Sequence, residues 1–312
     1  MDLNKNSKIY LAGHNGMVGS SILRLLKKKK YKRIYTKTRS NLDLLDQAKT
    51  LKYLKSIKPD FVIIAAAKVG GILANSNSKA EFIYQNIMIQ TNIIHSSYLA
   101  GVKKLILLGS SCVYPKYANQ PIKEGYLLSG ALEETNDAYA IAKIAGIKMC
   151  ESYNNQYNLN YLCLMPTNLY GPNDNFDLKS SHVLPAMIRK FHEAKINSNA
   201  PVTVWGSGSP KREFLYVDDL GQAVLFALEN SLEEHLYNVG TGIDLTIKDL
   251  AELIQLVVGH KGQIDWDVSM PDGTPRKLMD SSKIEKKGWQ PKTDLKSGVL
   301  KTYAWYLDNR AS

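Results

Sequence analysis

The spacing of apolar positions divides the chain into two parts. Up to about residue 166, short apolar runs alternate with longer segments in which apolar residues recur every three or four positions. Runs of the first kind predict buried strands, and segments of the second kind predict helices packed against a sheet. The predicted strands span 8–12, 33–38, 61–66, 104–109 and 160–165, and the predicted helices span 17–29, 46–57, 79–100 and 137–157. The alternation predicts an α/β fold around a parallel sheet.

After Pro166 the pattern changes. Stretches rich in Gly, Pro, Asn and Ser at 170–173 and 205–210 separate the remaining predicted elements. These are helices at 183–195, 218–230, 246–258 and 296–308 and a strand at 263–267. We expect residues 1–170 to form the first domain. Residues 171–312 then form mainly a smaller C-terminal substrate-binding lobe, from which about 215–240 return to the first domain.

Three glycines follow the first predicted strand and open the first predicted helix. Gly13, Gly16 and Gly19 allow a tight turn and a close approach of the backbone to a pyrophosphate, which the helix N-terminus attracts. Their spacing, G-x-x-G-x-x-G, differs from the more familiar G-x-G-x-x-G, so the strand before and the helix after carry the assignment. The motif predicts a dinucleotide-binding, doubly wound sheet of Rossmann type.

The residue beyond the second strand selects between nicotinamide cofactors. An acid there binds the ribose 2′-hydroxyl of NAD, and an Arg accommodates the 2′-phosphate of NADP. Arg39 lies twenty residues after Gly19, and no acid precedes Asp43. Arg39 as a plain surface residue is the alternative, but we favour NADP.

A tyrosine and a lysine lie four residues apart in one predicted helix. Tyr139 and Lys143 share a helix face, and a buried ammonium beside a phenol is expected to lower the pKa of that phenol. Such a phenol exchanges a proton with a substrate oxygen. Ser110, at the end of a predicted core strand, is a candidate to bind the same oxygen.

With the glycine turn, these residues resemble the extended short-chain dehydrogenase/reductases, which act mainly on nucleotide sugars. Longer motifs resemble the GDP-L-fucose synthases, NADPH-dependent 3,5-epimerase/4-reductases of GDP-4-keto-6-deoxy-mannose. The similarity covers about residues 8 to 308. Its motifs lie at 65–71, 82–86, 109–116, 165–172, 181–182 and 271–277.

The resemblance implies a role for each matching residue. Tyr139 is the proton donor, assisted by Lys143 and Ser110, while Cys112 is the epimerase base and His182 the acid. The implied cofactor-binding residues are Gly13, Asn15, Gly16, Met17, Val18, Gly19, Arg39, Ala66, Ala67, Gly109, Lys143, Pro166, Asn168, Leu169 and His182. The implied residues for the GDP end are Lys190, Trp205, Arg212 and Asp272. Relatives often carry Arg where this chain has Asn15 and Lys190.

Other interpretations of these residues stay open. A lone cysteine such as Cys112 is more often a packed apolar residue of the core. His182 could simply be a residue at a helix N-terminus, and Trp205 an aromatic side chain packed in its loop. Related reductases act on GDP-4-keto-heptoses, and some reduce C4 without epimerisation. A nucleotide-sensing regulator without turnover is a further alternative.

Composition narrows the class of protein. The formal net charge is +11, and its densest basic run, at 27–30, ends a predicted helix, where cations suit the dipole. With no accompanying nucleic-acid motif, we expect neither a nucleic-acid nor a membrane partner. The polar start of the chain and the three sparse cysteines predict a cytoplasmic enzyme without a metal site. The family resemblance implies a homodimer through the helices at about 79–100 and 137–157.

Overall fold

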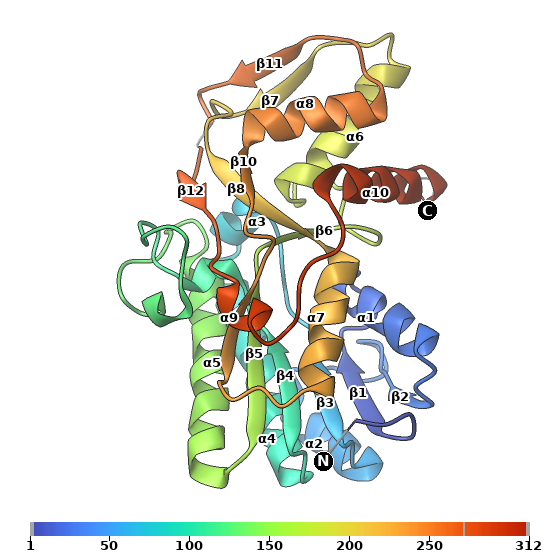
Figure 1. Ribbon diagram of the computed structural model, residues 1–312, viewed down its shortest axis with the longest axis vertical. Coiled ribbons are helices and arrows are strands. Elements are labelled where there is room, and N and C mark those ends of the chain that lie inside the picture. Colours follow the sequence, from blue (N-terminus) through green and yellow to red (C-terminus); the bar gives the residue numbers. More distant parts are fainter. Residues whose placement is uncertain (1–2, 271, 310–312) are drawn as a thin grey trace.

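A six-stranded parallel sheet forms the core of the first domain, in the lower half of Figure 1. The computed structural model describes residues 3–270 and 272–309. The sheet order is β2-β1-β3-β4-β5-β9, and β1 lies between β2 and β3. The chain thus builds outward from β1 in both directions, which confirms the predicted doubly wound sheet. The strand bounds are β1 Lys8–Ala12, β2 Arg33–Tyr35, β3 Phe61–Ile64, β4 Lys104–Leu108, β5 Asn160–Pro166 and β9 Leu236–Val239.

Helices cover both faces of this sheet because side chains alternate along each strand. Ile9 and Leu11 pack with α1 and α7, whereas Tyr10 and Ala12 face the core beneath α2, α4 and α5. The helix bounds are α1 Met17–Lys28, α2 Gln47–Ile57, α3 Ile72–Asn77, α4 Lys79–Leu99, α5 Asp137–Tyr157 and α7 Val217–Glu229. Among the described residues, no helix has the length and apolar character needed to span a membrane.

The C-terminal lobe has its own apolar core, at the top of Figure 1. Leu184, Phe191, Val204 and Ile254 belong to it. Its helices and its two-stranded parallel sheet match the predicted elements, apart from one strand that was not predicted, β7. The bounds are α6 Val183–Ile196, α8 Ile247–Val258, α10 Leu295–Asn309, β7 Val202–Trp205 and β11 Ile264–Asp267.

Short strands between the two parts were also missed. β8 pairs with β6, β10 and β12 and links the lobe to the first domain. These strands span only two to six residues and carry several charges, so no alternation of apolar and polar positions marks them. Their bounds are β6 Asn168–Tyr170, β8 Lys211–Tyr216, β10 Asp244–Thr246 and β12 Arg276–Lys277, and the short α9 spans Ser282–Glu285. After β8, α7 packs on α1. Strand β9, which was not predicted either, then joins the large sheet.

Candidate active site

The glycine turn after β1 brings backbone segments into direct contact. Gly13 has a φ of 86°, and a Cβ there would lie 2.5 Å from the Ala66 nitrogen. A Cβ at Gly19 would lie 2.6 Å from the Gly13 carbonyl carbon, whereas a Cβ at Gly16 would meet only the Gly13 oxygen, at 3.7 Å. Gly13 and Gly19 are therefore required by close packing, and Gly16 is not.

The N-terminus of α1 presents backbone N–H groups without a competing side chain. Gly16 caps the helix with no side-chain hydrogen bond, and the first turn contains no acidic residue. Asn15 is exposed, and Met17 and Val18 are half-buried beside it. Unpaired N–H groups and the positive end of the helix dipole suit the pyrophosphate of a dinucleotide.

Arg39 lies beyond β2 on the same edge of the sheet as the glycine turn, because β1 and β2 run parallel. Its side chain is exposed. A guanidinium at this position suits a 2′-phosphate through paired hydrogen bonds.

The other predicted cofactor residues also gather at the carboxyl edge of the sheet. Ala66 and Ala67 follow β3, and Gly109 follows β4. Gly109 is so closely packed that a Cβ there would overlap the Met165 side chain. Pro166 ends β5, and Asn168 and Leu169 begin β6. Ligands bind in the crevice at this edge of doubly wound sheets.

Ser110, Tyr139 and Lys143 come from the end of β4 and the first turns of α5. Lys143 is only 3% exposed. Its ammonium donates to the Leu108 carbonyl oxygen at 2.8 Å and lies 5.7 Å from the centre of the Tyr139 ring. Ser110 caps the short turn at 111–113, where its hydroxyl accepts from the Cys112 N–H at 3.4 Å.

The expectation that Lys143 lowers the pKa of Tyr139 is wrong for this arrangement. Burial raises the pKa of Tyr139, and the electrostatic effect of Cys112 raises it further. Burial also lowers the pKa of Lys143 to about 8, while Cys112 and Cys163 oppose that change. The ammonium is held by the Leu108 carbonyl rather than by the phenol, so Tyr139 is protonated at neutral pH. That is the form in which it donates a proton.

Cys112 lies in the turn after Ser110 with only 6% of its surface exposed. Burial raises the pKa of its thiol, and four smaller effects oppose it: the charge of Lys277, the Ser110 hydroxyl, the charge of Lys143 and the backbone N–H of Cys112. The effect of burial is larger than that of these groups, so the pKa of the Cys112 thiol stays above its ordinary value. By contrast, Cys150 and Cys163 lie fully buried in α5 and β5, as expected of core residues.

His182 is the N-cap residue of α6 and has an exposed side chain. Desolvation nevertheless lowers the pKa of its imidazole. The preceding backbone is fixed, because the Gly71 N–H donates to the Ser180 oxygen at 2.9 Å and a Cβ at Gly71 would lie 2.5 Å from the Ser181 oxygen.

The four residues predicted for the GDP end form two contacting pairs in the lobe. The Lys190 ammonium lies 5.6 Å from the centre of the Trp205 ring, which is 44% exposed. Arg212 donates to the Asp272 carbonyl oxygen at 3.4 Å. The Asp272 carboxylate in turn accepts from the Ser207 N–H at 2.7 Å, two residues beyond Trp205.

Two charged residues, Lys277 and Glu133, were missed by the sequence analysis. Lys277, on β12, interacts electrostatically with Cys112, Arg212 and Glu133. Glu133 is nearly buried and pairs with Lys116 at 3.0 Å. Lys277 ends the 271–277 motif, so its membership of a matched motif was the available signal.

Comparison with known proteins agrees with this architecture. Residues 9–240 match the model of the NAD dependent epimerase/dehydratase family. The chain therefore belongs to this family of nucleotide-cofactor enzymes, as the resemblance predicted.

Three individual proteins illustrate the similarity. GDP-L-fucose synthase 1 of Arabidopsis thaliana is 55% identical over 98% of this chain and 94% of that protein. The crystal structure of a GDP-6-OMe-4-keto-L-xylo-heptose reductase from C. jejuni is 38% identical, with a TM-score of 0.94 and 99% of both chains covered. A GDP-L-fucose synthetase from Naegleria fowleri, bound to NADP, is 29% identical with a TM-score of 0.92, over 100% of this chain and 96% of that one.

Proposed function

We propose that this protein is an NADPH-dependent epimerase/reductase that converts GDP-4-keto-6-deoxy-mannose to GDP-L-fucose. One observation carries the proposal: Cys112 lies in the same turn as Ser110 and interacts electrostatically with Tyr139 and Lys143. An epimerase base is thus next to a reductase proton donor. The 55% identity to a GDP-L-fucose synthase supports this choice of substrate.

The residues at the carboxyl edge of the sheet fit a bound NADPH. The backbone N–H groups at the N-terminus of α1, which Gly16 caps without a side-chain hydrogen bond, bind the pyrophosphate, and Arg39 binds the 2′-phosphate. When bound, the cofactor supplies the hydride that reduces C4 of the sugar. Lys143 additionally holds the nicotinamide ribose. The NADP bound to the Naegleria fowleri relative supports the same cofactor here.

Epimerisation uses the acidity that the C4 ketone gives to the C–H bonds at C3 and C5. The Cys112 thiolate removes the proton, and the electron pair of the broken bond moves to the C4 oxygen. Ser110 and Tyr139 stabilise the resulting enolate by hydrogen bonds. His182 then returns a proton to the opposite face of the same carbon, which inverts the centre and restores the ketone.

Reduction uses Tyr139 as the acid. The phenol protonates the C4 oxygen as C4 is reduced, and Ser110 orients that oxygen. In this scheme Lys190, Trp205, Arg212 and Asp272 hold the GDP end in the lobe. The cationic side chains bind phosphates, and the exposed Trp205 face stacks on a flat ring.

A C4 reductase of a GDP-4-keto-heptose is the second candidate. The C. jejuni heptose reductase covers 99% of this chain with a TM-score of 0.94 and therefore favours it. The two candidates differ in whether C3 and C5 are inverted before C4 is reduced, so product stereochemistry separates them.

We also propose that the protein is a cytoplasmic homodimer. In each subunit the C-terminal lobe begins near residue 171. Exposed apolar side chains on α4 and α5, which pack against each other, support the dimer; Tyr84 is 59% and Ile141 46% exposed. Three unpaired cysteines suit a reducing compartment. Sedimentation of wild type and Ile141→Asp tests the interface, because the variant is expected to sediment as a monomer.

The decisive experiment is turnover with NADPH and GDP-4-keto-6-deoxy-mannose in D₂O, followed by NMR of the product. We expect GDP-L-fucose with deuterium at C3 and C5, and loss of that deuterium in Cys112→Ser. A C4-reduced product without ring deuterium would show a reductase without epimerase activity. Absence of NADPH oxidation with this sugar, but turnover of a GDP-4-keto-heptose, would favour the second candidate.

A further inference from the structure

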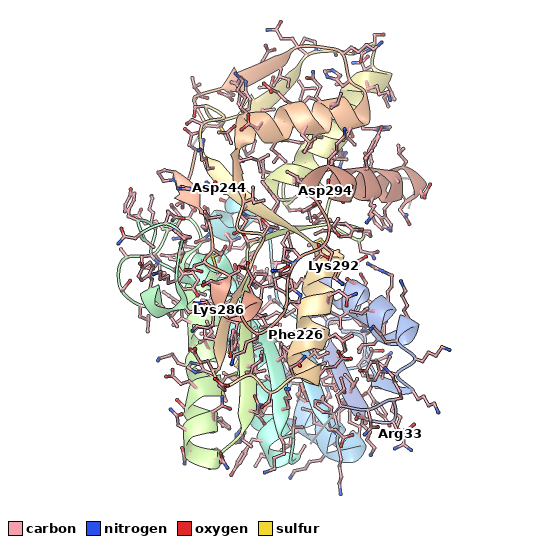
Figure 2. The ribbon with its side chains drawn as sticks, viewed as in Figure 1. Arg33, Phe226, Asp244, Lys286, Lys292 and Asp294 are labelled. Carbon is pink, nitrogen blue, oxygen red and sulfur yellow. The ribbon has the colours of Figure 1, made fainter. Side chains whose placement is uncertain are left out.

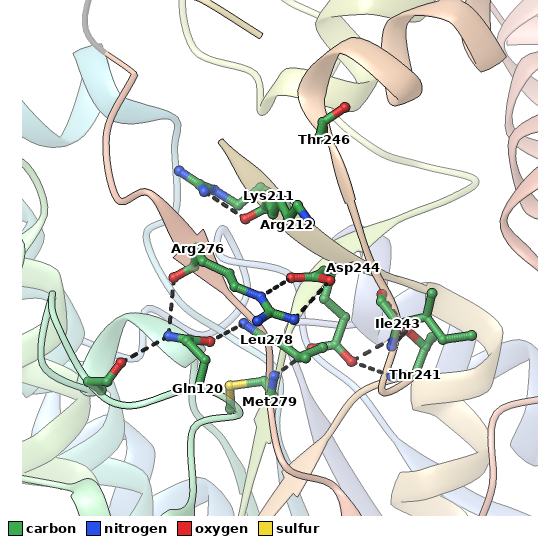
Figure 3. A network of polar contacts seen from close by, with 12 residues as sticks. Gln120, Lys211, Arg212, Thr241, Ile243, Asp244, Thr246, Arg276, Leu278 and Met279 are labelled. Carbon is green, nitrogen blue, oxygen red and sulfur yellow. Dashed lines mark hydrogen bonds and ion pairs between the residues drawn. The ribbon is translucent and has the colours of Figure 1, made fainter. Parts of the chain in front are cut away.

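Polar contacts join the chain beyond residue 171 to the first domain at several separate points. The Gln120 side chain accepts from the Leu278 N–H at 2.8 Å, just after β12 (Figure 3). In the linker at 292–294, which leads into α10 (Figure 2), the Thr293 N–H donates to a carboxylate of α7 at 2.9 Å. A third contact is made by the residues that directly precede His182.

This third contact involves the loop at 68–71, which follows the predicted cofactor residues at the end of β3. The Gly71 N–H donates to the Ser180 carbonyl oxygen at 2.9 Å. A Cβ at Gly71 would lie 2.5 Å from the Ser181 oxygen, so the two backbones pack directly against each other. The 68–71 loop therefore supports the backbone that leads into His182.

The 68–71 loop also packs toward Tyr139. A Cβ at Gly70 would lie 3.3 Å from the Cζ atom of Phe82. The Phe82 ring is only 2% exposed and meets the Tyr139 ring edge-on, with 6.4 Å between the ring centres. A displacement of the loop therefore changes the position of one proposed acid, His182, relative to the other, Tyr139.

Two buried asparagine side chains hold the two ends of this loop. Asn86 of α4 accepts from the Lys68 N–H and donates to the Lys68 carbonyl oxygen, both at 3.0 Å. Asn75 belongs to α3, which lies at the level where the lobe meets the first domain (Figure 1). Its amide donates to the carbonyl oxygens of Gly70 at 2.6 Å and of Gly71 at 3.1 Å. Only 1% of Asn86 and 6% of Asn75 are exposed, so both sets of hydrogen bonds are shielded from water.

We propose that Asn75 is a positioning residue for the epimerase half of the reaction, which holds the 68–71 loop against the residues that precede His182. It acts on the reaction through Gly71 and Ser180. The inference rests on the proposed function for the identity of that reaction. The placement of His182 by Asn75 is tested without it.

Acylation of His182 in the full-length protein tests this placement. Diethylpyrocarbonate reacts with the neutral imidazole, and mass spectrometry of the His182 peptide gives the rate at each pH. Desolvation lowers the pKa of His182, so the midpoint of the rate profile reports how closely protein atoms surround the ring. In Asn75→Ala the loop is released, and we expect the midpoint to rise toward the ordinary value of about 6.5.

Asn77→Ala is the matched control, because it removes the same kind of side chain from an exposed position in the same helix. It is expected to keep the wild-type midpoint. An unchanged midpoint in folded Asn75→Ala, or an equal rise in Asn77→Ala, would overturn the proposal. If Asn75→Ala fails to fold, Asn75→Leu, which has a similar shape but no donor, takes its place in the same comparison.

The stereochemistry of deuterium labelling tests the link to epimerisation. Cys112 takes a proton from C3 or C5, and the thiol exchanges that proton for a deuteron in D₂O. When His182 is misplaced, the thiol returns the deuteron to the face from which the proton came, which labels the carbon without inverting it. Because a displacement of about 1 Å costs about 10²-fold in rate, we expect the ratio of inverted to uninverted labelled sugar to fall at least about tenfold in Asn75→Ala.

Binding of NADPH separates this role from general damage to the site. Asn86 still holds Lys68 in Asn75→Ala, so we expect the wild-type Kd for NADPH. Equal losses of inversion and of labelling would show a structural defect and overturn the proposed role. If the wild type neither labels nor inverts this sugar, the proposed function fails, and the acylation profile still decides whether Asn75 places His182.

Discussion

Replacing Gly19 by Ala tests whether the glycine turn is required by packing. The new Cβ would lie 2.6 Å from the Gly13 carbonyl carbon, 2.8 Å from the His14 Cα and closer still to the Gly13 oxygen. Carbon atoms prefer separations of about 3.5–4.0 Å, so α1 must retreat from the turn by about 1 Å. These atoms all belong to the backbone and cannot rotate away.

The cost of this retreat follows from overpacking in general. Such substitutions destabilise by about 1–3 kcal/mol, which for a chain of 312 residues lowers the Tm by roughly 2–5 °C. Because α1 also supplies the N–H groups of the pyrophosphate site, we expect the Kd for NADPH to rise at least about tenfold, or ~1.4 kcal/mol. Calorimetry measures the Tm, and titration of the nicotinamide fluorescence measures the Kd.

Gly16→Ala is the matched control within the same turn. Its Cβ would meet a single atom, the Gly13 oxygen, at the ordinary distance of 3.7 Å, and only a favourable N-cap residue is lost. We expect a cost below about 1 kcal/mol. Wild-type values of both Tm and Kd in Gly19→Ala, or equal losses in Gly16→Ala, would show that close packing does not require Gly19.

Three further substitutions test separate parts of the molecule. Tyr139→Phe should slow NADPH oxidation about 10²–10⁴-fold, while C3 and C5 still exchange deuterium. An unchanged rate of NADPH oxidation would show that Tyr139 is not the acid. Glu213→Gln takes one acceptor from three backbone N–H groups and should cost about 1–3 kcal/mol in urea unfolding, whereas exposed Glu252→Gln should cost almost nothing. Burial raises the pKa of Asp174 to about 7, so wild-type stability falls as pH rises from about 4 to 7. Asp174→Asn should therefore gain about 1–2 kcal/mol at pH 8 and nothing at pH 4, and an equal gain at both would exclude this cause.

The parts of the site that could be predicted are those set by residues close together in the sequence. Tyr139 and Lys143 were found because helix periodicity fixes their shared face, and Gly13 because a strand and a helix flank it. The pKa of Tyr139 was predicted with the wrong sign, because burial of the phenol raises it, and the Lys143 ammonium donates to the Leu108 carbonyl instead of the phenol. No sequence rule specifies such a partner 35 residues away.

The sequence by itself determined the first five strands of the sheet, its covering helices and the glycine turn. Each of these follows from a local period or a backbone requirement that a few adjacent residues express. The tertiary structure alone decided the strand pairs between the two parts. β12 contains only two residues and has no period of its own; its place depends on β8 and on acceptors such as Glu213, which are distant in sequence. The pKa values of buried groups such as Tyr139 and Lys143 depend on burial and on distances through space, and only the folded chain sets both.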